Sequence, residues 1–186
     1  MEKNLAILKS TSHRYVLAAL RRDTRGLAAI EFALIASFMA MAVLNVVDVS
    51  TFLYDRLQVN NATQVGAQAA WQACDLNHLP VTTKCPGMSA AVTAAVQSTS
   101  LGGAVQLQSG YPSDGFYCVS SGGTLQYVSD YSSPPANCSA AGNSGLIPAE
   151  YVKVQTTFTY TPIFAGLSVV SILPATITAT SYVRMH

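Results

Sequence analysis

Four residues near the N-terminus have types and a spacing that suit one kind of chemistry. Arg25 and Gly26 end a basic stretch, Leu27 opens an apolar run, and Glu31 is the single charge within that run. Glycine disfavours a helix by about 1 kcal/mol relative to alanine, which leaves the backbone open to a peptidase at the membrane face. Hydrolysis after Gly26 would create an ammonium group on Leu27, about one helical turn from the carboxylate of Glu31. These residue types and their spacing therefore suit peptide-bond cleavage between Gly26 and Leu27.

Two roles remain open for the carboxylate of Glu31. In the first it pairs with the new ammonium of its own chain or of a neighbouring subunit, because an unpaired carboxylate inside a membrane helix costs about 3 kcal/mol on insertion scales. A close pair is stronger in apolar surroundings than in water, so it favours lateral packing in one register. In the second, Glu31 lies only about 6 Å along the helix from Leu27 and reaches the cytoplasmic interface without a further role. The flanking Arg25-Gly26 and Phe32 favour the first interpretation.

The apolar run is long enough to cross a membrane. Leu27–Val47 contains 21 residues with a single charge, and at 1.5 Å per residue it spans about 30 Å, the thickness of a bilayer core. Asp48 then marks the outer interface. Because no proline or glycine interrupts the chain before Gly66, we expect one helix from about Leu27 to about Ala73, in which residues 48–73 form a soluble extension.

The soluble extension carries an apolar stripe that we expect to face an outer domain. Its members recur at roughly helical spacing, and the polar side chains lie elsewhere on the helix. The predicted stripe consists of Leu53, Leu57, Val65 and Ala69.

Charge is distributed unevenly along the 186 residues. The net charge is +1, but six of the ten basic residues precede Leu27, namely Lys3, Lys9, Arg14, Arg21, Arg22 and Arg25. From Leu27 onward there are four basic and seven acidic residues, a net charge of −3. A basic flank before a span places the N-terminus in the cytoplasm and the remainder outside. Residues 1–26 are therefore predicted to be a basic cytoplasmic leader, and the outer part lacks the basic patch that nucleic-acid binding needs.

All four cysteines lie beyond the predicted span. An even number on the exported side indicates disulfides in an oxidising compartment. Cys74–Cys85 and Cys118–Cys138 close the shortest loops and are the favoured pairs, although the other pairings and free buried thiols stay open. A metal site made of Cys74, His78 and Cys85 fits no common zinc spacing, so we expect no metal and no cofactor.

The remaining chain, residues 74–186, predicts a small α+β domain. Met88–Ser98 reads as a helix with Met88, Val92 and Val96 on one face, and Tyr151–Tyr160 alternates as a half-buried strand. Ile163–Leu173 is an apolar connector too short to span a bilayer as a helix. The other predicted elements are a strand at 104–108, a hairpin of 116–120 and 125–129, an exposed loop at 129–145 and a final strand at 175–184. The predicted fold class is therefore α+β, a long N-terminal transmembrane and spine helix followed by a disulfide-stabilised antiparallel sheet.

The stretch Arg25-Gly26-Leu27-Ala28-Ala29-Ile30-Glu31-Phe32-Ala33-Leu34 resembles the N-terminus of the TadE-like family. These are minor pilins or pseudopilins of the tight-adherence (Tad, Flp) type IV pilus system. The likeness covers roughly Arg25–Cys74 and Glu150–Met185, with departures at Ser37, Phe38 and Gln68. It continues in Leu53-Tyr54, 59–62, 66–70, 151–154, 160–164 and 175–185.

The resemblance implies a pilin-like fold and processing by a prepilin peptidase between Gly26 and Leu27, with Glu31 and Phe32 serving recognition and assembly. It also implies a single-pass protein of the bacterial inner membrane with a periplasmic C-terminal domain. Its partners would be the membrane, the peptidase, other pilins or pseudopilins and the pilus assembly platform. Its role would be to support pilus assembly, surface adherence and biofilm formation.

Two other classes of function stay open. An uncleaved signal-anchored periplasmic binding module or adhesin would use residues 74–186, and Tyr111, Tyr117, Tyr127 and Tyr131 could form its surface, although aromatic strand residues are more often core. An enzyme is the least favoured, since the sequence contains no P-loop, His-Glu-x-x-His or Gly-x-Ser-x-Gly motif. His13, His78 and His186 are scattered. We therefore expect neither catalysis nor a small-molecule substrate.

Overall fold

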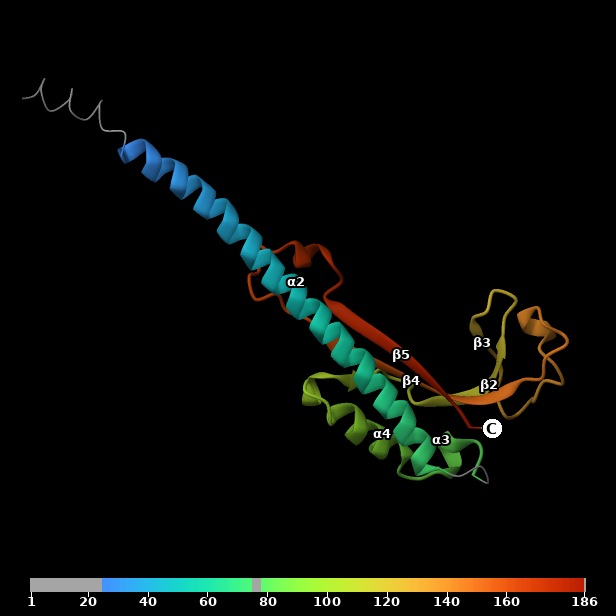
Figure 1. The fold of residues 1–186 in the computed structure, drawn as a ribbon. Coiled ribbons are helices and arrows are strands. Elements are labelled where there is room, and N and C mark those ends of the chain that lie inside the picture. The colour runs from blue at the N-terminus through green and yellow to red at the C-terminus, as the bar shows by residue number, and fades with distance from the viewer. Residues whose placement is uncertain (1–24, 75–77, 186) are drawn as a thin grey trace, which may run out of the picture. The chain divides into compact units, whose positions relative to one another are not determined.

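The computed structural model of the chain describes residues 25–74 and 78–185. The chain divides between Val47 and Asp48 into two compact units. One helix, α2 (Arg25–Ala73), contributes residues to both units (Figure 1). The prediction of one long N-terminal helix is confirmed, and within the described residues α2 covers Arg25–Ala73. The predicted leader lies outside the described residues, apart from its last two.

Within the described residues, short helices and five strands follow α2. The helices are α3 (Val81–Lys84) and α4 (Met88–Gln97), with 3-10 turns at Gly102–Ala104, Ser139–Ala141 and Val169–Ile172. The strands are β1 (Gln106–Leu107), β2 (Ser113–Val119), β3 (Leu125–Ser129), β4 (Ala149–Thr159) and β5 (Thr176–Arg184). The predicted α+β class is therefore confirmed.

The longest strand, β4, is the centre of an antiparallel sheet. On one edge it pairs with β5, from Tyr151 opposite Arg184 to Thr159 opposite Thr176. On the other edge it pairs with β2 over Ala149–Lys153 and then with β1. Strands β2 and β3 form the hairpin that the Gly-Gly turn predicted. The sheet thus places the start of β4 beside the hairpin and its end beside the segment that leads to β5 (Figure 1).

The alternation along β4 separates a buried face from a partly exposed one. Val152, Val154 and Thr156 are fully buried, as the period of two predicted. The second half of α2 packs on this face, where the hydroxyls of Thr63 and Thr156 form a hydrogen bond. Helix α4 completes the core with Met88, Val92 and Val96, the three positions that its spacing predicted.

The predicted apolar stripe on α2 is wrong for Leu53 and Leu57, whereas its other members, Val65 and Ala69, are half-buried. Leu53 and Leu57 are 50% and 68% exposed, and the core contact is made mainly by small side chains. A Cβ on Gly66 would lie 2.6 Å from Cγ2 of Val96, so the helix backbone approaches α4 too closely for a larger residue. The buried face of this part of α2 consists of Phe52, Val59, Ala62, Thr63, Gly66, Ala67 and Ala70. Close packing, rather than side-chain hydrophobicity, selected the face.

The strand predicted at 104–108 is shorter than expected. Gly102–Ala104 forms a 3-10 turn, Val105 is fully buried, and only Gln106 and Leu107 pair with β4. The first part of the predicted strand is therefore occupied by the end of this turn.

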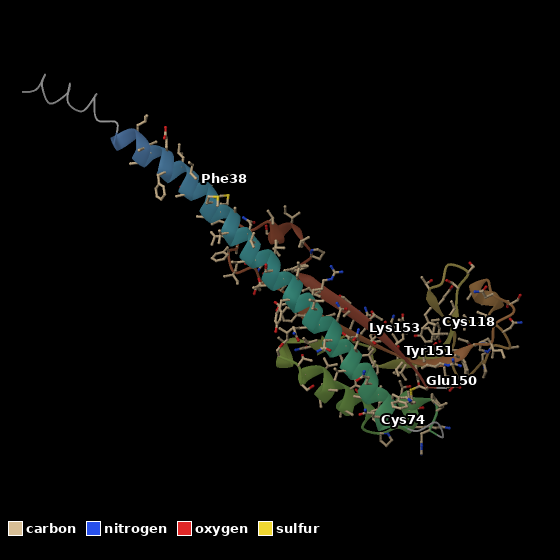
Figure 2. The ribbon with its side chains drawn as sticks, in the orientation of Figure 1. Phe38, Cys74, Cys118, Glu150, Tyr151 and Lys153 are labelled. Carbon is tan, nitrogen blue, oxygen red and sulfur yellow. A yellow bond between two sulfur atoms is a disulfide. The ribbon has the colours of Figure 1, made fainter. Side chains whose placement is uncertain are left out.

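Both favoured disulfides are present. Cys74–Cys85 joins the residue after α2 to the turn before α4, and Cys118–Cys138 joins β2 to the long loop after β3 (Figure 2). The second bridge lies in a small cluster of its own with Ala141 and the half-buried Val128. Because Cys74 and Cys85 are bonded to each other, the alternative metal site with His78 is wrong. Within the described ranges, no group of three potential ligands comes together elsewhere.

Candidate functional site

The predicted cleavage and assembly residues lie in the first two turns of α2. Gly26, Leu27, Glu31 and Phe32 are all exposed, and Phe32 is exposed to 73%. A Cβ on Gly26 would meet nothing within 4 Å. The bond between Gly26 and Leu27 belongs to the helix, because α2 begins at Arg25. No residue of the described fold therefore covers the predicted scissile bond.

The rest of this half of α2 has an outward apolar surface. Its most apolar stretch is not buried within the protein at all, and the helix is long and apolar enough to cross a membrane. Phe38, for example, is 76% exposed (Figure 2). The other large exposed side chains are Leu27, Ile30, Phe32, Leu34, Ile35, Met39, Met41, Val43, Val46 and Val47. This surface suits a single-pass membrane anchor.

Two polar side chains in this apolar stretch bond to their own helix. The hydroxyl of Ser37 donates to the carbonyl of Ala33 at 2.7 Å, and the amide of Asn45 donates to the carbonyl of Met41 at 2.8 Å. Such local bonds remove the cost of placing a polar group in lipid. Glu31 has no equivalent route, because an ionised carboxylate only accepts hydrogen bonds and the helix carbonyls cannot donate one.

A second carboxylate on α2, that of Asp48, is fully buried. Its Oδ1 accepts from the backbone N–H of Ile163 at 3.0 Å and its Oδ2 from that of Phe164 at 3.3 Å. The backbone carbonyl of Asp48 accepts from the hydroxyl of Tyr160 at 3.1 Å and from that of Thr51 at 2.9 Å. These hydrogen bonds hold the segment after β4 against α2 at Asp48, the residue where the outer unit begins.

The sequence placed Asp48 at the outer interface but did not predict this junction. A usable signal was present, since an aspartate directly after a membrane-length run needs donors when it is buried. The donors belong to Tyr160-Thr161-Pro162-Ile163-Phe164, more than a hundred residues away in the sequence.

The partly exposed face of the sheet carries a group of tyrosines. The ring of Tyr117 meets those of Tyr127, Tyr151 and Tyr182 edge-on, at centroid distances of 5.4 to 5.8 Å. Tyr117 itself is buried, and burial is the main cause that raises its pKa to about 12. Tyr127 is 51% exposed, so the tyrosines predicted as either core or surface are divided between the two.

A lysine extends this aromatic face. The ammonium of Lys153, which is labelled in Figure 2, donates to the hydroxyl of Tyr111 at 3.2 Å and lies 5.1 Å from the centre of that ring. It also lies 5.9 Å from the ring centre of Tyr182. The result is a mixed aromatic and cationic surface.

Comparison with known families gives a match on the N-terminal helix. The family model described as TadE-like protein matches residues 26–68. Neither the curated proteins nor the solved structures give a match. The match covers the first half of α2 and most of the second, so the predicted likeness at Glu150–Met185 stays a prediction.

Proposed function

We propose that this chain, whose residues 26–68 form a TadE-like domain, is a minor pilin or pseudopilin of a Tad-type pilus assembly and secretion machinery. Members of this family are generally structural components rather than enzymes. In this proposal the protein supports pilus assembly, surface adherence and biofilm formation. The observation that carries it is that the family match coincides with an apolar, outward-facing helix and begins at Gly26.

Processing is the first step of the proposed function. A prepilin peptidase cleaves between Gly26 and Leu27 and so removes the basic leader from the cytoplasmic side. The exposure of this bond supports the step. The open space beside Gly26 supports it too, because a Cβ placed there would meet nothing within 4 Å.

Glu31 is the assembly residue in this scheme. Its carboxylate needs a donor that its own helix does not supply, and cleavage creates one as the ammonium of Leu27. The partner is this ammonium on the same chain or on a neighbouring subunit. In lipid such a pair is worth more than at a protein surface, which selects one register between adjacent helices.

The second half of α2 offers a lateral surface for neighbouring subunits. Leu53, Leu57 and Trp71 are 50%, 68% and 55% exposed. Leu53 and Trp71 are separated by about five helical turns and therefore lie on the same face, and Leu57 lies beside Leu53 because it follows about one turn later. Exposed apolar side chains that recur along one face indicate an interaction surface.

Two substitutions test processing and assembly separately. Gly26→Leu should leave the leader attached, because a branched side chain blocks the approach to the scissile bond. Glu31→Ala should be cleaved normally, so that N-terminal sequencing of the recovered protein gives Leu27, but should yield few or no pili. Ser37→Ala is the matched control, because it removes a polar group of the same helix that already has a partner. Normal pili from both Gly26→Leu and Glu31→Ala would refute the mechanism.

The aromatic face favours one alternative function. Tyr111, Tyr182 and Lys153 would suit an uncleaved, signal-anchored binding module or adhesin. That protein would retain Met1 when it is recovered from the native envelope, and Glu31→Ala would leave its binding unchanged. The N-terminal residue therefore distinguishes the two functions directly.

A further inference from the structure

The segment between β4 and β5, residues 161–175, is apolar, uncharged and exposed. It contains no Asp, Glu, Lys, Arg or His. Five of its large apolar side chains are exposed to 43% or more, and Ile172 reaches 84%. They are Ile163, Leu167, Val169, Ile172 and Leu173. A soluble domain rarely exposes so many large apolar groups within one short segment unless something covers them.

The segment is folded rather than extended. The backbone N–H groups of Leu167 and Ser168 donate to the carbonyl of Phe164, each at 3.1 Å. The hydroxyl of Ser168 accepts from the N–H of Val170 at 3.2 Å and caps the 3-10 turn at Val169–Ile172. Ser168 and Val170 are buried, so they occupy the inside and direct the larger apolar side chains outward. Internal bonding of the backbone is what a segment needs before it can enter an apolar medium.

The segment is attached to the protein next to the end of the predicted membrane span, and this position indicates that lipid covers it. Asp48 follows the last residue of the predicted span directly, and its carboxylate holds the N–H groups of Ile163 and Phe164 at 3.0 and 3.3 Å. When Leu27–Val47 crosses a bilayer, Asp48 lies at the outer interface, and the segment begins within hydrogen-bond distance of it. The argument rests on the membrane anchoring that is part of the proposed function.

We propose that residues 161–175 form a second membrane contact, an interfacial loop whose exposed apolar side chains enter the outer leaflet of the bilayer that the anchor spans. A lipid surface fits because the segment offers neither charge nor exposed pairing strands to a protein partner. Apolar side chains of interfacial segments reach about 5–10 Å into the boundary between headgroups and acyl chains. Contact at both the anchor and the loop would hold the outer domain in one orientation on the membrane before assembly.

The opposite end of β4 provides an internal control. Ile147 precedes β4 and is 85% exposed, which matches the 84% of Ile172. An eleven-residue strand separates the two ends by roughly 33 Å. Exposure alone would give both isoleucines the same surroundings, whereas the proposal places only Ile172 in lipid.

Tryptophan reporters in the full chain test the proposal. The single native tryptophan, Trp71, is first replaced by phenylalanine. Ile172→Trp, Ile147→Trp and Phe38→Trp are then made separately and reconstituted in phosphatidylcholine vesicles that contain doxyl-labelled lipids. We expect a blue-shifted emission and about twofold quenching of Ile172→Trp by a label near the headgroups, in line with interfacial depth. Ile147→Trp should be unaffected, and Phe38→Trp should be quenched most by a label deep in the acyl chains.

Each other outcome has a definite meaning. If Phe38→Trp is quenched but Ile172→Trp is no more quenched than Ile147→Trp, the loop proposal is overturned and the anchor stands. If Phe38→Trp is not quenched, membrane anchoring fails and the loop proposal fails with it. A blue shift of Ile172→Trp without lipid quenching assigns the loop to a protein contact, such as a second copy of the chain, and overturns the lipid assignment.

Discussion

The two halves of α2 each contain one glycine and one key carboxylate, and these pairs have opposite surroundings. In the first half, Gly26 has open space where a Cβ would stand and Glu31 is exposed. In the second half, a Cβ on Gly66 would collide with Val96, and the carboxylate of Asp48 is fully buried between two backbone donors. One continuous helix therefore contains two pairs of a glycine and a carboxylate, one pair exposed and the other packed into the fold.

The comparison separates groups that serve the fold from groups that await a partner. Asp48 and Gly66 already have every contact that their positions require, so their substitution should act on stability. Gly26 and Glu31 have no such contacts within the described fold, so their substitution should act on processing and assembly. In the proposed function their partners are a peptidase and a new ammonium group, neither of which belongs to the folded domain.

Asp48→Ala should give the largest effect of any substitution in the comparison. It leaves the N–H groups of Ile163 and Phe164 without an acceptor and releases the start of residues 161–175. Because hydrogen bonds to a charged group contribute about 1.5–3 kcal/mol each, we expect the free energy of unfolding to fall by about 3 kcal/mol. Chemical denaturation of the full chain in detergent micelles, followed by circular dichroism, measures this change.

Glu31→Ala is the matched control for Asp48→Ala. It removes the other carboxylate of α2 and should leave the unfolding transition of the outer domain where it was. Cleavage after Gly26 should proceed in both variants. A similar loss of stability in the two would break the distinction between a carboxylate that serves the fold and one that serves assembly.

Gly66→Ala should have a smaller but measurable effect. The added methyl group would lie 2.6 Å from Cγ2 of Val96, and β-branched valine cannot move aside as a long flexible side chain can. Overpacking costs about 1–3 kcal/mol, of which the better helix propensity of alanine returns about 1 kcal/mol. We therefore expect a net loss of about 1 kcal/mol in the free energy of unfolding.

Gly26→Ala provides the reference for that measurement. It adds the same methyl group to the same helix at a position with no neighbour, so the unfolding transition of the outer domain should not shift. A gain in stability for Gly66→Ala instead of a loss would show that helix propensity outweighs the collision with Val96. Relief of the loss by Val96→Ala in the Gly66→Ala background would locate the collision.

Patterns that act locally were readable from the sequence. The absence of proline and glycine between Leu27 and Gly66 predicted one long helix, the period of two predicted β4 and β5, and the spacing of Met88, Val92 and Val96 predicted the face of α4. The two disulfides followed from loop length. Each of these features depends on residues close together in the chain, where geometry is fixed by the helix or the strand itself.

Features that depend on distant residues were not readable. Helical spacing assigned the buried face of α2 to Leu53, Leu57, Val65 and Ala69, whereas the close approach of α4 selected Gly66 and its small neighbours. The donors to Asp48 come from beyond β4, and nothing local marks them. At the N-terminal site the sequence supplied the residue types, but the partners of Glu31 lie outside the folded chain and stay a prediction.

A third carboxylate on α2, that of Asp55, tests whether the carboxylates of this helix divide into one group that serves the fold and one that serves assembly. Asp55 is half-buried, and burial alone raises the pKa of its carboxyl group. A raised pKa means that the folded state binds a proton more tightly than the unfolded state. The stability that protonation of Asp55 gives the folded state is therefore present below the ordinary pKa of 3.8. It is lost as the pH rises through the higher pKa that Asp55 has in the folded state.

Asp55→Asn removes the ionised form that burial disfavours. At neutral pH it should be neutral or stabilising by a few tenths of a kcal/mol, on the order expected for a partly exposed position. This gain should vanish when denaturation is repeated below pH 3.8, where the native carboxyl group is already protonated. Asp48→Asn should behave in the opposite way at neutral pH, because it weakens two charged hydrogen bonds. If Asp55→Asn also destabilises the chain at neutral pH, Asp55 has a donor of its own, and it belongs with Asp48 among the groups that serve the fold.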